Sequence, residues 1–318
     1  MKKTFIRSAV ISLTIMVSVS AIYGQTPPDK VAGIPVNYDE SLSGTYTLPD
    51  PLIFPDGKKV PVQRTGKFGR LNPDIFLSQG IGFATVYYGD IEPDFADGIK
   101  YGIRGYYLKE GQDYPAPDEW GAISAWSWGL SRAMDYFETD KQIDPKKIAL
   151  FGVSRLGKTV LWTGCRDTRY GMVIASCSGE GGAAVSRRWY GETIDHMTHP
   201  TRYFYQFAGN WRNYKDDPAK SPVEANMLVS LMAPRSLLLQ TGDTDKWSDP
   251  KGEFLAAVSA ASVYELLGKR SLGTDIYPAA GTPVLNDLGY YMHAGGHGAL
   301  PADYEIFLRF MKMHFFGK

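Results

Sequence analysis

Short apolar runs and longer amphipathic stretches alternate along the chain from about residue 70 onward. The short runs are nearly continuous and end at turn residues, which predicts buried strands at residues 82–89, 146–153, 171–177, 235–242 and 288–295. The longer stretches repeat apolar residues at helical spacing, which predicts helices at residues 117–140, 156–166, 223–233, 251–268 and 301–316. This alternation predicts an α/β fold with a mostly parallel sheet between two layers of helices.

The composition limits the classes of function. The chain of 318 residues carries 34 basic and 34 acidic side chains, so it has no overall positive field that would attract nucleic acid. Apolar residues make up 44% of the chain, which is ordinary for a globular protein with a sizeable core. The 20 tyrosines and 7 tryptophans are compatible with a surface that stacks on sugar rings, although packing is the commoner role of any single ring.

The first residues resemble a targeting segment. Lys2, Lys3 and Arg7 precede a mostly apolar run, and a small-residue sequence suited to cleavage ends at Ala21. The run is too short for a convincing membrane span, and no cysteine directly follows it as a site for a lipid, so we expect no membrane anchor. We therefore expect residues 1–21 to be a signal peptide and the protein to be periplasmic or secreted.

The remaining chain divides into two parts. Residues 22–70 are rich in Pro, Gly and Asp with weak periodicity, which predicts an irregular N-terminal arm, and we expect residues 71–318, which carry the alternating pattern, to form a single domain. The two cysteines, Cys165 and Cys177, fall at opposite ends of their predicted elements, too far apart for the Cα separation of about 7 Å that a bridge allows. We expect no disulfide.

The stretch "IALFGVSRLGKTVLW" at residues 148–162 predicts a strand that turns into a helix around Ser154. In hydrolases such a turn exposes a serine hydroxyl above the end of the sheet. Asp245 follows a later predicted strand and His297 follows the last one, in the chain order that α/β-hydrolases use. An imidazole can take the proton of the serine, and a carboxylate orients that imidazole. The pattern therefore predicts a serine triad in an α/β-hydrolase-like three-layer α/β/α sandwich.

Each member of this set also has a less specific interpretation. A glycine-containing turn after a strand can cradle phosphate or simply pack a helix on a strand. Asp243 and Asp249 compete with Asp245, which is favoured because it lies on the loop just beyond the strand. His293 lies within the strand pattern, where a core role is commoner, whereas His297 lies in a glycine-flanked loop.

Arg155 directly follows the serine, and the second glycine of the elbow comes one residue late, at Gly157. The ester intermediate develops an oxyanion, which the backbone N–H after the nucleophile can stabilise. A guanidinium at this position adds a permanent positive charge with several donors. A surface ion pair is the alternative role for Arg155.

These residues resemble the glucuronoyl esterases of carbohydrate esterase family 15, whose elbow reads G-C-S-R-x-G-K where this chain has "GVSRLGK". The resemblance implies Ser154 as the nucleophile, Arg155 as the oxyanion partner and His297 as the base. It covers the chain from about residue 72 to the C-terminus and includes "YYGDIEPDF", "DEWGAISAWSWGLSRAMDYFETD", "SGEGGAAVSRRWYGET", "LMAPRSLLL", "DKWSDPKGEFLAA" and "HAGGHG".

The position of the acid differs within that family. Fungal members place it directly before the S-G-x-G-G-A-A segment, where this chain has Cys177, which cannot serve as a carboxylate. Many bacterial members use an aspartate in a D-x-W sequence, which corresponds here to Asp245. The resemblance thus agrees with the choice made from the residues alone, and Glu180 is a weaker rival.

The resemblance also implies sugar contacts. They map to Lys158, Glu192 and Trp247, whose side chains can bond ring hydroxyls or stack on the ring. Arg187 or Arg188 could approach the uronate, or either could be a surface charge.

The implied function is a secreted serine esterase that hydrolyses the ester between 4-O-methyl-glucuronic acid of glucuronoxylan and lignin alcohols. The resemblance implies no metal and no cofactor, and we expect a monomer. The alternatives are an acetyl or feruloyl xylan esterase, or a degenerate carbohydrate-binding homologue without catalysis. Family members usually carry a substantial segment between the "YTLPDPL"-like stretch and the first strand near residue 82. That segment is short here, so we expect the first strands of the sheet to be absent, which would expose an apolar edge.

Overall fold

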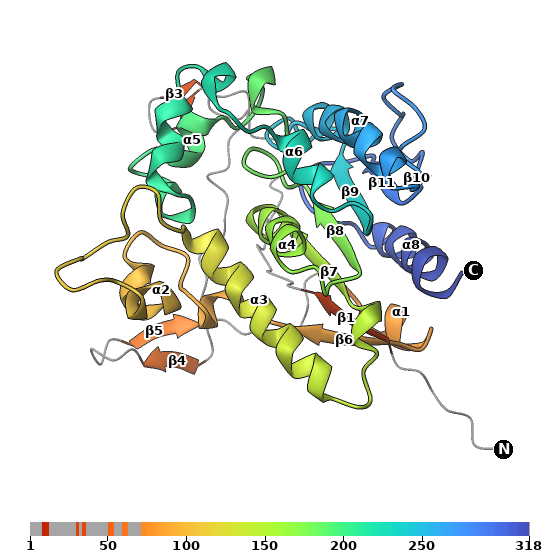
Figure 1. Ribbon diagram of the computed structural model, residues 1–318, viewed down its shortest axis with the longest axis horizontal. Coiled ribbons are helices and arrows are strands. Elements are labelled where there is room, and N and C mark those ends of the chain that lie inside the picture. The colour runs from red at the N-terminus through yellow and green to blue at the C-terminus, as the bar shows by residue number, and fades with distance from the viewer. Residues whose placement is uncertain are drawn as a thin grey trace.

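The computed structural model describes residues 71–317 and, within residues 1–70, only the backbone of five short strands. The expected signal peptide and arm lie otherwise outside the described residues. The main sheet has seven strands in the order β10-β11-β9-β8-β7-β1-β6 (Figure 1). Its parallel strands are β6 (Ile81–Thr85), β7 (Ala149–Val153), β8 (Met172–Ser176), β9 (Ser236–Gly242), β11 (Leu288–His293) and β1 (Ser8–Ser12). Only β10 (Val284–Leu285) is antiparallel, to β11, among the described strands of this sheet.

Helices cover both faces of the sheet. The larger layer consists of α3 (Ala122–Thr139), α4 (Arg155–Arg166), α6 (Ala225–Ser230) and α7 (Pro250–Leu266). The opposite face is covered by α1 (Asp74–Leu77) and α8 (Asp303–Phe316). The predicted three-layer α/β/α arrangement with a mostly parallel sheet is confirmed.

The buried strands alternate between the two cores because successive side chains point to opposite faces. In β7, Leu150 packs with the α3–α4–α7 layer, whereas Ala149 and Phe151 pack with α8. Both faces are apolar, which explains the nearly continuous apolar runs of the sequence.

Two predicted boundaries move because local hydrogen bonds compete with the sheet. The Asp144 side chain accepts from the N–H of Lys146 and caps the 3₁₀ turn Pro145–Lys147, so β7 begins only at Ala149. A second 3₁₀ turn, Tyr88–Asp90, follows β6, which therefore ends at Thr85.

Strand β1 lies between β6 and β7 and pairs in parallel with both. We expected the first strands of the sheet to be absent, but β1 occupies the place between β6 and β7, so the sheet has no gap there. The same residues belong to the expected signal peptide, and that expectation stays a prediction. The other strands of the N-terminal region form two-stranded sheets, β2 (Lys30–Val31) with β3 (Ile34–Pro35) and β4 (Asp50–Ile53) with β5 (Lys59–Val62).

The connection between β8 and α6 is long and contains only short helical elements. It contains the helix α5 (Ile194–Thr198) and four 3₁₀ turns, Ser186–Arg188, Phe204–Gln206, Gly209–Tyr214 and Pro218–Lys220. Together with the segment after β6, which includes the 3₁₀ turn Gly98–Tyr101 and α2 (Ile103–Tyr106), it forms loops next to the carboxyl ends of the strands (Figure 1).

Cys165 and Cys177 are both free thiols, which confirms that they form no disulfide with each other. Within the described part of the chain, no helix has both the length and the apolar character needed to cross a bilayer.

A buried ion pair fastens the segment after β6 to α3. Glu92 and Arg104 are almost completely buried, and Nε of Arg104 lies 2.8 and 3.0 Å from the two carboxylate oxygens. Arg104 Nη1 donates to the carbonyl of Trp120 at 2.9 Å, and Trp126 Nε1 donates to the carbonyl of Glu92 at 2.8 Å. The pair thus ties the start of α3 to the loop that also carries Asp94.

We expect Arg104→Met to lower the free energy of unfolding by about 3–5 kcal/mol, because it leaves the Glu92 charge buried without its partner. Urea denaturation measures this change. The control is Lys100→Ala, which removes an exposed pair with Asp97 and should change stability little. Equal effects of the two substitutions would contradict the structural role of the buried pair.

Candidate active site

The first turn of α4 forms a sharp elbow after β7. Ser154 stands on it with φ 61° and ψ −128°, a conformation that costs a non-glycine residue energy, and its N–H donates to the carbonyl of Ser176 at 2.8 Å. A Cβ at Gly152 would lie 2.3 Å from the carbonyl oxygen of Leu156, and one at Gly157 would lie 2.6 Å from that of Ser176. The displaced glycine is therefore needed where the helix packs against the end of β8.

The predicted base and acid are in direct contact. His297 Nδ1 lies 2.8 Å from Asp245 Oδ2, and Ser248 Oγ lies 3.1 Å from the same ring nitrogen. Burial would raise the pKa of Asp245, but the His297 charge and the hydrogen bonds from His297 and Ser248 lower it below its usual value. Asp245 is therefore a carboxylate that accepts the Nδ1 proton, which leaves Nε2 available to take a proton.

Cys177 lies beside the same pair. Its Sγ, an Asp245 oxygen and a His297 nitrogen all lie within 4.8 Å of one another. Burial raises the pKa of the Cys177 thiol well above its usual value, and the thiol accepts from the N–H of Gly298 at 3.3 Å. His297 Nδ1 contacts Asp245 and Cys177 Sγ contacts the Gly298 N–H, so each of these side chains has a hydrogen-bonding partner in the protein.

Arg155 is held by a carboxylate that the sequence analysis did not identify. Asp94, on the loop after β6, pairs with the Arg155 guanidinium, which also lies over the ring of Tyr203 at 5.2 Å. Asp94 accepts further hydrogen bonds from Tyr205 at 2.7 Å and Gln206 at 2.8 Å. The arginine is therefore fixed in place between two loops rather than extended into solvent.

The three expected sugar contacts lie together. Lys158 Nζ donates to Glu192 Oε1 at 2.8 Å and to the carbonyl of Ser178 at 2.7 Å, and the N–H of Glu192 donates to the carbonyl of Trp247 at 2.8 Å. All three side chains are buried. The indole N–H of Trp247 is buried and meets no acceptor among the described residues, whereas the ring contacts His196 and Arg202.

Two buried acids near the site are neutral at moderate pH. Burial raises the pKa of Glu180 and of Glu253 to about 8. Glu180, the rival acid, accepts from the Ser186 hydroxyl, and Glu253 accepts from the N–H of Gly179 at 2.7 Å. Neither arrangement suits a carboxylate that must orient His297.

His293 is buried in a pair that holds the His297 loop. Its Nδ1 lies 2.7 Å from Asp303 Oδ2, and its Nε2 lies 2.9 Å from the carbonyl oxygen of Gly296. Gln240 Nε2 also lies 3.0 Å from Nδ1. Burial lowers the pKa of His293, but the hydrogen bond and the charge of Asp303 outweigh it, so the pKa is raised. Asp303 also accepts from the N–H of Leu300 at 2.7 Å, so the pair fixes the loop at two points.

The remaining candidates have other partners. Asp243 accepts from the N–H of Gly295 at 2.8 Å, and Asp249 pairs with Arg188 at 2.8 Å. Arg187 pairs with Glu224 at 3.6 Å. Both arginines considered for the uronate are therefore engaged with carboxylates.

Known proteins with similar sequences are carbohydrate esterases. The chain is 43% identical over 249 residues to "Carbohydrate esterase MZ0003" from an unknown prokaryotic organism, covering 78% of this chain and 57% of that protein. It is 28% identical over 257 residues to "4-O-methyl-glucuronoyl methylesterase 1" of Wolfiporia cocos, covering 79% and 61%. The chain thus spans about three fifths of the length of these curated relatives.

A solved structure and a family model agree with these relatives. The glucuronoyl esterase from Solibacter usitatus superposes with a TM-score of 0.80 at 40% identity, covering 97% of this chain and 74% of that one. The family model described as glucuronyl esterase of fungi matches residues 45–268. With most of its length matched, and with the elbow, the histidine and the aspartate at one edge of a parallel sheet, this chain belongs to the glucuronyl esterase family.

Proposed function

We propose that this protein is a serine esterase that cleaves the ester between 4-O-methyl-glucuronic acid on glucuronoxylan and a lignin alcohol. The observation that carries the proposal is the 2.8 Å contact of His297 with Asp245 at the sheet edge where Ser154 stands on a strained elbow. The printed activity of the Wolfiporia cocos relative supports the sugar acid. The xylan chain and the lignin alcohol are proposed in addition, as the two partners that the ester joins.

In the proposed mechanism, Ser154 Oγ attacks the ester carbonyl while His297 Nε2 takes its proton. Asp245 stabilises the resulting imidazolium. The C–O bond to the alcohol then breaks, and the alcohol leaves with the proton from His297. Water, activated by the same imidazole, hydrolyses the acyl-enzyme and releases the free uronate and Ser154.

Arg155 contributes to the charged intermediate. Its backbone N–H and its guanidinium can both donate to the oxyanion, and preorganised donors are effective because they need no rearrangement during the reaction. Asp94 and the ring of Tyr203 hold the guanidinium in one orientation. Asp94 is thus proposed as a positioning residue.

The sugar would be recognised by the buried side chains of Lys158, Glu192 and Trp247 beside the elbow. Lys158 has one proton beyond its two hydrogen bonds, and the indole N–H of Trp247 meets no acceptor among the described residues. Hydroxyl or ether oxygens of the sugar could accept both donors. Glu192, which pairs with Lys158 at 2.8 Å, would accept a hydrogen bond from a sugar hydroxyl.

We also propose that the protein works as a monomer in the periplasm or outside the cell. The basic and apolar residues at its start and the polymeric substrate support this location. Cleavage after residue 21 would remove β1 from the sheet, so residues 8–12 cannot be leader and strand in the same molecule. The mass of the exported chain distinguishes the two.

The direct test is a panel of benzyl and methyl glucuronate, acetylated xylan and methyl ferulate, assayed with the purified protein. We expect turnover of the glucuronate esters in preference to the others, and no turnover by Ser154→Ala, because the substitution removes the nucleophile and little surface. Turnover by Ser154→Ala near the wild-type rate would rule out the serine mechanism.

Asp245→Asn should lower kcat by roughly 10³–10⁴, because an amide no longer stabilises the imidazolium. Glu180→Gln and Asp243→Asn are the matched controls and should be mild. In the Asp245→Asn background, Cys177→Glu should restore part of the activity, since Cys177 lies within 4.8 Å of His297. A larger loss from Glu180→Gln than from Asp245→Asn would move the acid to the Glu180 loop.

Arg155→Ala should lower kcat by about 10²–10³, the effect of one lost oxyanion donor. Asp94→Asn should lower kcat in the same direction but by less, since the guanidinium remains. Lys158→Met should instead raise KM for glucuronate esters and spare a small activated acetyl ester. An equal loss of kcat with both substrates would place Lys158 in the catalytic machinery.

His293→Asn should lower kcat by up to about 10²-fold with little change in KM, because small displacements of a catalytic group are costly. The loss should stay below that of His297→Ala. His199→Ala, on a surface loop, is the control and should leave both constants unchanged. A wild-type kcat for His293→Asn would show that the His293–Asp303 pair does not position the loop.

A further inference from the structure

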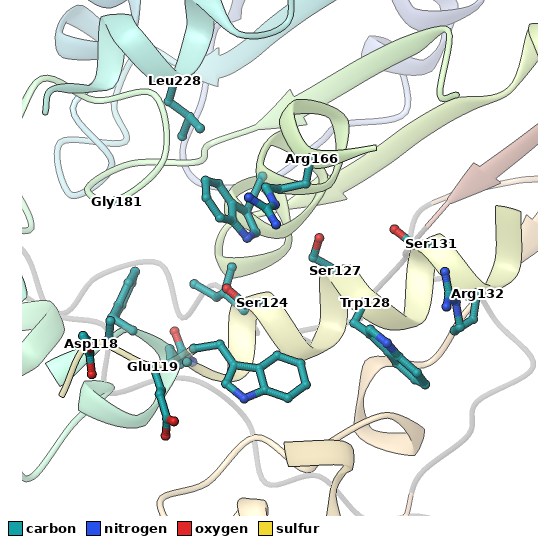
Figure 2. A pocket seen from close by; sticks show the side chains of 17 residues that line it. Asp118, Glu119, Ser124, Ser127, Trp128, Ser131, Arg132, Arg166, Gly181 and Leu228 are labelled. Carbon is teal, nitrogen blue, oxygen red and sulfur yellow. The ribbon is translucent and has the colours of Figure 1, made fainter. Parts of the chain in front are cut away.

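A cavity of about 660 Å³ lies along the helix layer, between α3 and the α4–α6 side of the molecule (Figure 2). We call this cavity the groove. Its volume is within the range of small-ligand sites, which is about 300–1,000 Å³. Three tryptophans line it, Trp120, Trp128 and Trp162. None of its lining residues belongs to the proposed triad or to the expected sugar contacts, so the cavity has no role in the mechanism above.

The tryptophans of this groove are only half-buried, and two of them are capped by arginines. The guanidinium of Arg132 lies 5.4 Å from the ring centre of Trp128, and that of Arg166 lies 5.7 Å from that of Trp162. The C–H face of a pyranose is apolar and packs on indole faces. A guanidinium thus lies over two of these indoles, and a sugar ring would stack on Trp120 or on the parts of the other two rings that the arginines leave exposed.

Hydroxyl groups lie between these rings. Ser124, Ser127 and Ser131 follow one another at helical spacing and line the groove from α3, and Figure 2 shows Arg166 on the side of α4 that faces them. Short hydroxyls can both donate to and accept from sugar hydroxyls. Ser131 already donates to Asp167, so the hydroxyls of Ser124 and Ser127 are the ones that would favour a polyhydroxylated ligand.

The charges of the groove are separated along its length. At the arginine end, Arg132 pairs with Asp135 at 3.0 Å, and Asp135, Glu138 and Asp167 are bonded to Arg169. No acidic side chain of residues 71–317 forms an ion pair with Arg166. The opposite end holds Asp118 and Glu119, and Glu119 is bonded to Lys109. A carboxylate on a sugar would thus be favoured at the arginine end.

The groove adjoins the wall of the catalytic site. Gln206 lines it and also donates to Asp94, the partner of Arg155. Gly181 lines it too, directly after Glu180, and a Cβ there would lie 2.8 Å from the Phe207 ring. One polymer chain could therefore contact the groove while one of its substituents reaches Ser154.

We propose that this groove is a second, non-catalytic carbohydrate site, which binds an acidic xylan chain by stacking on the tryptophans and by pairing a free uronate with Arg166. The proposal rests on the proposed function for the choice of polymer. The protein then binds the backbone of the xylan polymer at a site that is separate from the site that recognises the esterified sugar.

The binding test uses the full chain with Ser154→Ala and an ester-free aldouronic xylo-oligosaccharide, followed by calorimetry. We expect two sites per chain, and one site after Trp128→Ala or Arg166→Gln. Arg166→Lys should keep part of the second site, and a neutral xylo-oligosaccharide should bind it more weakly. Tyr136→Ala, an exposed aromatic on α3 outside the groove, is the matched control and should keep both sites.

The kinetic test separates this proposal from the proposed function. Trp128→Ala and Arg166→Gln should keep kcat/KM for benzyl glucuronate but lower kcat/KM for esterified glucuronoxylan by about tenfold. Equal kcat/KM of variants and wild type on the polymer, or a single site in the titration, would overturn the groove proposal. An aromatic alcohol that displaces the oligosaccharide from the groove would overturn the choice of ligand. If the wild type does not hydrolyse benzyl glucuronate, the proposed function is overturned instead. The calorimetric titration then still shows whether the groove binds the oligosaccharide.

Discussion

The first turn of α4 packs directly on the carboxyl ends of β7 and β8, and the candidate site is arranged around this contact. Gly152 and Gly157 make it possible, since a Cβ at either position would meet a carbonyl oxygen at 2.3 or 2.6 Å. The contact holds Ser154 in a positive-φ conformation, which persists only where the surroundings over-determine it. It also sends Arg155 toward Asp94 and Lys158 toward Glu192, so one turn supplies the proposed nucleophile, a cation and a proposed sugar contact.

Two sets of buried charges then fix the groups that must meet this turn. The Glu92–Arg104 pair secures the loop that carries Asp94, and the His293–Asp303 pair secures the loop that carries His297. Both pairs are far from water, where an unpaired charge would be costly, so each loop has one strongly preferred position. Rigid placement of this kind is what electrostatic stabilisation of an oxyanion requires.

The sequence alone was sufficient for five strands of the sheet, for the long helices and for the contact of Asp245 with His297, but it missed β1 and β10. Apolar runs and chain order report on these features, because strands buried on both faces are apolar and loops after parallel strands converge. It could not identify Asp94, which lies 61 residues before its partner Arg155 and resembles any loop aspartate. It also missed the burial of Lys158, because the sequence pattern after the elbow is equally compatible with an exposed lysine. The irregular segment between β8 and α6 has no periodicity, and only tertiary contacts define it.

Ser154 is thus proposed as an activated nucleophile inside a glucuronate-binding site. The most direct measurement is intact-protein and peptide mass spectrometry after treatment with a fluorophosphonate, which phosphonylates activated serines with loss of fluoride. We expect one adduct per chain, on the peptide that contains Ser154, and slower labelling in the presence of methyl glucuronate. Absence of an adduct, an adduct on another serine, or labelling that methyl glucuronate does not slow would rule out this role of Ser154.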